Sequence, residues 1–317
     1  KGQLKVSGPD FIFKGGTALF LTLPIPNRLS IDIDIIIPYQ TEIDPFLKQV
    51  IKQSDFTHFQ EQQRVSASSI NKAHYKFFYQ PVTYGKTRQE AILLDILYES
   101  SPYGTQLIEQ EVVSNFIKTT DTPVKVQVPT FEALTGDKLT AYAPNTTGIP
   151  YGVGKEIEII KQLYDIGNLF DQISDMSAVM KVFYNIAKQE LKYRSQPGIT
   201  ENNVLDDIIQ TSLCIATRGK EGDGDFDKLQ RGISNIGSYI FSESFHLEKA
   251  MLPAAKAAYL ASLLKQNSPN LKRFYDHSEI VDWHITLQPW NKVNKLKKTH
   301  PEAFYYWYMA LANLTAG

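Results

Sequence analysis

The sequence has little cysteine, no long apolar run and almost no net charge. A single cysteine, Cys214, among 317 residues excludes an internal disulfide framework and favours the reducing cytoplasm as the location. No apolar run approaches the roughly 20 residues that a membrane-spanning helix needs, so we expect no membrane partner. The histidines show no His-x-x-His spacing, which argues against a zinc site. Because the formal net charge is −1, a nucleic acid would have to be held by a local basic patch.

Two aspartates, Asp32 and Asp34, interrupt the apolar residues of a predicted strand over Asn27–Ile37, which ends in Ile35-Ile36-Ile37. In an extended strand alternate side chains share a face, so both carboxylates would point the same way. Two such charges are costly there unless a cation neutralises them, and oxygen ligands suit Mg²⁺, or Mn²⁺ in its place. An edge strand with a solvated acidic face is the alternative, but the isoleucines that follow favour an internal strand.

A glycine pair precedes these aspartates. Phe11–Phe13 predicts a buried strand and Thr17–Leu23 a helix, with Gly15 and Gly16 in the turn between them. A glycine turn at a helix N-terminus presents backbone N–H groups to phosphate oxygens. Together with the nearby carboxylates, the turn predicts a site for a nucleoside triphosphate.

A third carboxylate, Asp95, is the lone charge on the predicted strand Ala91–Tyr98. A buried carboxylate needs a partner, and a shared metal site with Asp32 and Asp34 would supply one. Such a set could hold two metal ions about 4 Å apart. An edge position for Asp95 is the alternative.

Two further charged positions lie on predicted helices. Lys138 shares an apolar face with Leu134 and Tyr142, so it either snorkels at the edge of that face or reaches a site where it offsets triphosphate charge. Lys161 and Asp165 form an i,i+4 pair, which by itself indicates no more than surface support.

The order of predicted elements indicates an α+β fold. A predicted helix over Asp44–Ser54 is followed by strand-like runs over Ala73–Val82, Glu90–Glu99 and Val124–Val128, with a turn at Tyr84–Arg88 between the first two. Strand signals cease near residue 174. We therefore predict a mixed-sheet domain over 1–174 and an all-helical domain over 175–317.

Two segments of the predicted helical domain could bind ligands but have simpler explanations. Glu221–Asp227 resembles the start of a calcium loop, yet Lys228 replaces the required glycine, which favours a solvated acidic turn. The lysine-rich segment Trp290–Lys298 is followed by the aromatic run Phe304–Tyr308. These residues could hold an RNA end, or the aromatic side chains could pack into the helical core.

Taken in order, the motifs resemble the AbiEii family of nucleotidyltransferases, the toxin halves of bacterial toxin–antitoxin or phage-defence pairs. The matching segments are Lys14–Leu19, Arg28-x-Ser30-x-Asp32-x-Asp34, Leu94–Ile96, Asp137–Leu139 and Lys161–Ile166. The resemblance implies a polymerase-β-like nucleotidyltransferase core with a mixed sheet, a helical C-terminal domain, and an antitoxin partner.

The resemblance also implies roles for single residues. Asp32 and Asp34 would bind the metal, Asp95 would be the third carboxylate, Lys138 would contact the triphosphate, and Asp165 would be an essential acid. The remaining nucleotide-binding residues would be Lys14, Gly15, Gly16, Thr17 and Ser30. One position departs from the family pattern, because Gln162 follows Lys161 where the last motif commonly has aspartate.

These observations predict an enzyme that transfers a nucleotide from an NTP to RNA, at the 3′ end of tRNA. A protein side chain or a small molecule as the acceptor is the first alternative. A non-catalytic module that binds an NTP or an antitoxin is the second.

Overall fold

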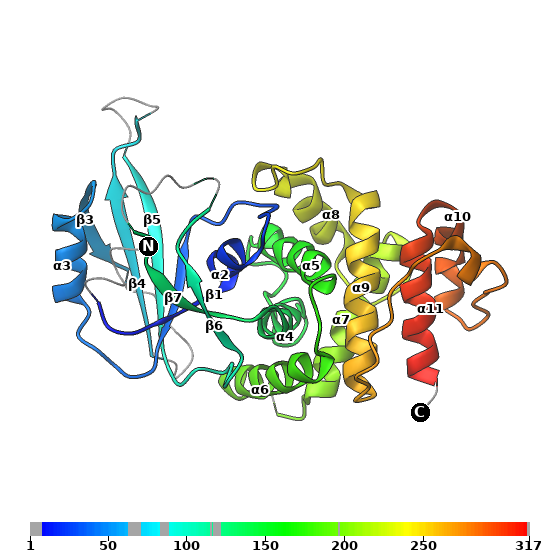
Figure 1. The fold of residues 1–317 in the computed structure, drawn as a ribbon. Helices are drawn as coiled ribbons and strands as arrows, with labels where there is room; N and C mark the ends of the chain where they lie inside the picture. The colour runs from blue at the N-terminus through cyan, green and yellow to red at the C-terminus, as the bar shows by residue number, and fades with distance from the viewer. Residues whose placement is uncertain are drawn as a thin grey trace. The chain divides into compact units, whose positions relative to one another are not determined.

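The computed structural model describes residues 8–62, 71–82, 89–114, 116, 122–195 and 197–315. It divides into two compact units, Lys1–Thr130 and Phe131–Gly317 (Figure 1). The last described strand ends at Pro129, well before residue 174. The two helices that follow it pack with the later helices, and they therefore belong to the second unit. The predicted domains 1–174 and 175–317 were placed where strand signals cease in the sequence, and that division stays a prediction.

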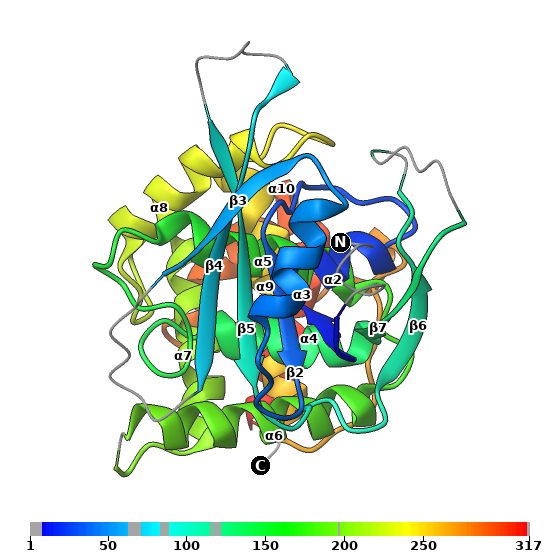
Figure 2. The same cartoon turned by 90° about the vertical axis from the view of Figure 1, so that its left-hand side faces the viewer.

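The first unit is built on a mixed sheet of seven described strands in the order β3-β4-β5-β2-β1-β7-β6 (Figure 2). Two pairs of neighbours run parallel, β2 with β5 and β1 with β7, and the other neighbours run antiparallel. The strands are β1 (Ile12–Lys14), β2 (Ile33–Ile37), β3 (Phe56–Glu61), β4 (Lys72–Tyr79), β5 (Glu90–Tyr98), β6 (Leu107–Glu111) and β7 (Lys125–Pro129). The predicted α+β fold with a mixed sheet is confirmed.

Two helices belong to this unit. Helix α2 (Gly15–Thr22) follows β1 without a break, and Pro24 and Pro26 lie just beyond its end. Helix α3 (Asp44–Lys52), which lies over one face of the sheet in Figure 2, has Pro45 in its first turn and buries Leu47 and Val50, as its apolar spacing predicts.

The acidic strand is shorter than predicted. We expected it to span 27–37, but β2 begins at Ile33, Asp32 lies in a bend before it, and Ile31 is 56 % exposed. The reason is the length of β1, which ends at Lys14 opposite Asp34, where the chain turns away. Residues before Ile33 therefore have no strand partner on that side.

Other strand predictions hold for the central strands and fail at the edges. β4, β5 and β7 agree with the predicted runs, whereas β3 and β6 were not predicted. These two are the edge strands, and their polar sequences FTHFQE and LIEQE show little of the pattern of a buried strand. The predicted turn at Tyr84–Arg88 lies outside the described residues.

The second unit consists of helices around one large hydrophobic cluster. Helix α9 (Leu247–Lys265) packs against α5, α7 and α11. The other helices are α4 (Phe131–Ala141), α5 (Glu156–Phe170), α6 (Met176–Arg194), α7 (Glu201–Thr217), α8 (Phe226–Asn235), α10 (Leu296–Thr299) and α11 (Pro301–Thr315), with the short 3₁₀ turns η2 (Ile236–Ser238), η3 (His277–Ile280) and η4 (Trp290–Lys295). In the described part of the chain, no helix is long and apolar enough to span a membrane.

Close packing of α4 on α6 depends on Gly136. A Cβ at this position would lie 2.8 Å from Phe183 N and 3.1 Å from Val179 O, both backbone atoms of α6. Helix α4 also carries Lys138, so this contact fixes the position of a predicted site residue.

We expect Gly136→Ala to lower the free energy of unfolding by about 1–3 kcal/mol, since α4 must move off α6 to admit the methyl group. In an open helix the same change would add up to about 1 kcal/mol of stability, so the sign is diagnostic. Denaturant unfolding followed by circular dichroism measures the change. Gly237→Ala is the control, because nothing lies within 4 Å of a Cβ there. Equal stability of the two variants would contradict the prediction.

Candidate active site

Four polar residues form a row across four neighbouring strands of the first unit. In the sheet register His74 on β4 is opposite Asp95 on β5, Asp95 is opposite Asp34 on β2, and Asp34 is opposite Lys14 on β1. Residues paired in this way point to the same face of a sheet. The structure thus places Asp34 beside Asp95 and puts a basic residue at each end of the carboxylate pair.

The row on the opposite face shows what fixes this register. Phe13, Ile35 and Ile96 are paired one residue along from Lys14, Asp34 and Asp95, and these three apolar side chains are fully or almost fully buried. A slip by one residue would bring charged side chains into the core. The hydrophobic core therefore holds the polar row in line.

Asp32 lies next to this row but outside the strand. Its Oδ1 atom accepts a hydrogen bond from Leu93 N at 3.4 Å, which directs the carboxylate toward β5. Its backbone oxygen accepts a hydrogen bond from Thr17 Oγ1, so the bend that contains Asp32 is tied to the first turn of α2.

The turn at the start of α2 requires glycine twice. Gly15 has φ +63°, and a Cβ there would lie 2.6 Å from Asp34 Oδ2. A Cβ on Gly16 would lie 2.6 Å from Ser30 Oγ and 3.0 Å from Arg28 Nη2. The two glycines let the chain pass directly beside the carboxylate on one side and beside Ser30 and Arg28 on the other.

The N-terminus of α2 can accept a phosphate. The cap residue Lys14 makes no side-chain cap hydrogen bond, and the first turn of the helix contains no acidic residue. Backbone N–H groups and the positive end of the helix dipole favour an anion there. Arg28, only 8 % exposed, brings a guanidinium to the same turn.

The carboxylates fit Mg²⁺, which usually takes one or two protein carboxylates and completes its shell with waters and substrate phosphates. Asp34 and Asp95 supply such a pair of oxygen donors, next to a turn that suits phosphate. In the described residues, no group of three or more His, Cys, Asp and Glu side chains forms a ready-made metal cluster. The role of Asp32 as a further ligand stays a prediction.

In the second unit, Lys138 on α4 contacts α5. Lys138 Nζ lies 2.9 Å from Asp165 Oδ2 and donates to Gln162 Oε1 at 2.9 Å, and the Lys138 and Asp165 side chains are 5 % and 1 % exposed. Removing one partner of such a buried ion pair leaves an uncompensated charge, which is strongly destabilising. The two predicted residues Lys138 and Asp165 are thus brought together, and Gln162, at the position that departs from the family pattern, joins them.

The predicted i,i+4 pair of Lys161 with Asp165 was wrong. Lys161 Nζ instead lies 2.8 Å from Glu158 Oε1 and 3.5 Å from the centroid of the Tyr239 ring. Asp165 is instead paired with Lys138, which reaches it from α4. Sequence spacing identified the helix but not which side chains meet.

A cationic patch forms where the end of α7 contacts η4. Its four basic side chains are all exposed: Arg218, Lys220, Lys292 and Lys295. Burial, followed by the charges of Lys220 and Arg218, lowers the pKa of Lys295, as expected when like charges gather. The neighbouring acid Glu248, which pairs with Arg218, offsets only part of this charge.

The aromatic run beside this patch is not a stacking surface. Phe304, Tyr305, Tyr306 and Trp307 are at most 3 % exposed and pack into the core of the second unit. Of the two alternatives for Phe304–Tyr308, core packing is therefore correct for these four residues. Any RNA contact here would rest on the basic side chains.

Cys214 is also a core residue. It is fully buried on α7, its Sγ donates to Gly224 O at 3.3 Å, and burial raises the pKa of its thiol to about 11. A thiol that is neutral and inaccessible at neutral pH is a poor nucleophile. The acidic turn Glu221–Asp227 packs directly against this cysteine, since a Cβ on Gly224 would lie 2.8 Å from Cys214 Sγ.

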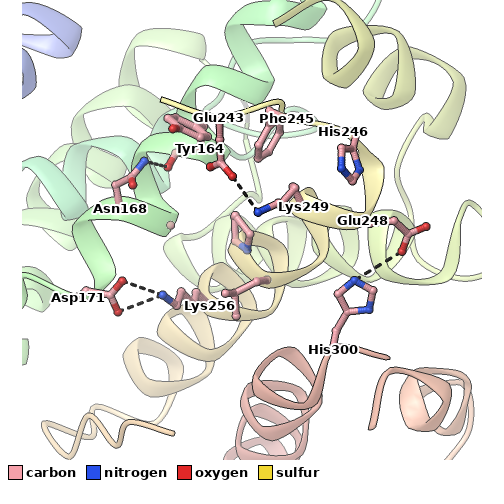
Figure 3. A pocket seen from close by; sticks show the side chains of 13 residues that line it. Tyr164, Asn168, Asp171, Glu243, Phe245, His246, Glu248, Lys249, Lys256 and His300 are labelled. Atoms are coloured by element: carbon pink, nitrogen blue, oxygen red, sulfur yellow. Dashed lines mark hydrogen bonds and ion pairs between the residues drawn. The ribbon is translucent and has the colours of Figure 1, made fainter. Parts of the chain in front are cut away.

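A cavity of about 480 Å³ lies between α5, α9 and the start of α11 (Figure 3). Its charged side chains are paired with one another: Lys256 with Asp171 at 2.9 Å, Lys249 with Glu243 at 3.1 Å, and His300 with Glu248 at 3.6 Å. None of the predicted site residues lines it. Its balanced charges favour neither an anion nor a cation.

Sequence reasoning missed three residues that the structure places at these sites. Arg28 was visible only as part of a motif, and Gln162 only as a departure from one. His74 carries no local signal, because its contact with Asp95 Oδ1, at 2.7 Å, depends on the pairing of β4 with β5.

Comparisons with known proteins identify the family. A family model described as "Nucleotidyl transferase AbiEii toxin, Type IV TA system" matches residues 3–235. Among curated proteins there is no match. Among solved structures, the nucleotidyltransferase toxin MenT4 from Mycobacterium tuberculosis is 14 % identical with a TM-score of 0.52, and the match covers 96 % of this chain and 89 % of MenT4. JHP933 from Helicobacter pylori is also 14 % identical, with a TM-score of 0.46 and coverage of 84 % and 89 %.

The likeness to MenT4 supports the fold alone, because the sequence identity is low. The family match covers well over half of the chain, and the motifs that carried the resemblance lie within the matched residues. The predicted enzyme class is confirmed by that match. This chain therefore belongs to the AbiEii nucleotidyltransferase toxin family.

Proposed function

We propose that this protein transfers a nucleotide from an NTP to the 3′ end of tRNA, with Mg²⁺, or Mn²⁺ in its place, bound at Asp34, Asp95 and Asp32. The observation that carries the proposal is the register that puts Asp34 beside Asp95, next to a helix N-terminus opened by two glycines. Carboxylates for a metal and N–H groups for a phosphate occur together where one metal-bound triphosphate could use both. Since the family description names a type IV toxin–antitoxin system, we further propose that this protein has an antitoxin partner.

The chemistry is an in-line displacement. The acceptor hydroxyl gives up its proton to water as its oxygen attacks the α-phosphorus of the NTP, the bond from that phosphorus to the oxygen that bridges it to the β-phosphorus breaks, and pyrophosphate leaves. A bound Mg²⁺ supplies positive charge that offsets the negative charge of the triphosphate. Gly16, Thr17 and Ser30 would hold phosphate oxygens, and Lys14 and Arg28 would add positive charge at that turn.

Lys138 is proposed as a further triphosphate contact. Its ammonium has three N–H donors, and Asp165 and Gln162 account for two of them. Asp165 is the essential acid in this proposal because it fixes Lys138 in place, and Gln162 serves as a neutral second acceptor.

RNA as the acceptor is supported by the cationic patch of Arg218, Lys220, Lys292 and Lys295. Exposed clusters of basic side chains bind the phosphate groups of nucleic acids. Because the net charge of the chain is only −1, the protein as a whole does not attract RNA, and the patch would have to do so locally.

The central experiment incubates the protein with total tRNA, Mg²⁺ and each α-labelled NTP in turn, followed by gel analysis. We expect label on tRNA from one NTP, and only background label with Asp34→Ala or with EDTA, since both remove the proposed metal site. Circular dichroism checks that the variant is folded. Label on the protein would favour a different acceptor, and no label on either would favour a binding module.

Lys138 can be tested apart from its structural role. We expect Lys138→Met to lower the free energy of unfolding by about 3–5 kcal/mol, because Asp165 is left as a buried unpaired charge. The double variant Lys138→Met with Asp165→Leu should recover most of that stability but transfer no nucleotide. Denaturant unfolding and the labelling assay give the two readouts. If the double variant were stable and still transferred nucleotide, the role of Lys138 would be structural only, and the proposed triphosphate contact would be wrong.

The cationic patch predicts salt-dependent RNA binding. Replacing Lys292 and Lys295 with glutamine should weaken tRNA binding, and should reduce the slope of log affinity against log salt by roughly 0.7–0.9 for each lysine that contacts phosphate. Fluorescence anisotropy across a salt series measures this slope. The control replaces Lys181 and Lys188, two exposed lysines of α6. An equal effect in both pairs would refute a specific role for the patch.

A further inference from the structure

His74 makes a direct contact with one carboxylate of the site. It is opposite Asp95 in the antiparallel pairing of β4 with β5, and its Nδ1 atom lies 2.7 Å from Asp95 Oδ1. This is the distance of a short, charge-assisted hydrogen bond, in which the imidazole N–H donates to the carboxylate. The His74 side chain is 16 % exposed and that of Asp95 35 %, so the donor is the more buried of the two.

The backbone that carries His74 is held on both sides. Strand β4 lies between β3 and β5, and His74 O accepts a hydrogen bond from Gln62 N at 2.7 Å. On the opposite face of β4, Tyr75 and Phe77 are each 5 % exposed and anchor the strand in the core. A donor on such a rigid element can orient the group it contacts.

Asp95 needs orientation because it stands between two different neighbours. The χ2 torsion of aspartate is broad, so a carboxylate on a strand can present its oxygens in many directions. Here Asp34 is on one side and His74 on the other, in the same row of the sheet. A hydrogen bond from His74 to one oxygen fixes the plane of the carboxylate relative to Asp34.

We propose that His74 is a positioning residue for nucleotidyl transfer, which holds the Asp95 carboxylate in the orientation needed to bind the metal ion together with Asp34. This inference rests on the proposed function. Carboxylates that bind metals are commonly held by such an outer hydrogen bond, and losing it typically costs about 10–100-fold in metal affinity or activity.

The test measures Mn²⁺ binding by electron paramagnetic resonance, with the full chain and no nucleotide. We expect His74→Ala to weaken Mn²⁺ binding by about tenfold or more. His74→Asn should bind Mn²⁺ about as tightly as the unaltered protein does, because the asparagine amide can donate a hydrogen bond where Nδ1 does. His58→Ala, which removes an exposed imidazole on the neighbouring strand β3, should have no effect. The rate of nucleotide transfer should follow the same order among the variants.

The outcomes separate this inference from the proposed function. Mn²⁺ binding that is absent, or that is the same in Asp34→Ala, would overturn the proposed metal site and this inference with it. Binding that depends on Asp34 but is unchanged or tighter in His74→Ala would overturn the role of His74 alone. An equal loss in His74→Ala and His74→Asn, with both variants folded by circular dichroism, would also overturn it, since the amide would then fail to replace the imidazole.

Discussion

The site of this protein depends on two like charges held side by side. Asp34 and Asp95 are paired across two parallel strands. Two carboxylates so close together repel each other unless a positive charge offsets them. Lys14 and His74 occupy the two outer positions of the same row, one beside each carboxylate. A divalent cation bound between the carboxylates would complete that balance, and the triphosphate would bring it there.

The same few residues explain why the glycines are needed. Strand β1 is only three residues long, and the chain must leave the sheet directly beside Asp34. Only a residue without a side chain can pass there, and only with the positive φ that Gly15 adopts. The helix that follows begins at once, so its N-terminus lies beside the carboxylates.

Much of this arrangement follows from the sequence, and what does not has a physical reason. The period-2 pattern around Asp95 and the glycine turn before Asp34 are local signals, and they predicted the central strands and the proposed ligands of a metal. The pairing of His74 with Asp95 and that of Lys138 with Asp165 join residues far apart in the chain, and nothing local encodes them. The edge strands β3 and β6 were missed because their pairing is decided by packing, which outweighs the local pattern.

The apolar row of Phe13, Ile35 and Ile96 has a consequence for how the family could vary. These buried side chains, and not the polar residues themselves, keep Lys14, Asp34, Asp95 and His74 in line. The alignment of the polar residues is thus maintained by buried side chains on the opposite face of the sheet. Substitutions among the polar residues could therefore leave the register unchanged, whereas a charged residue in place of one of the three apolar ones would disturb it.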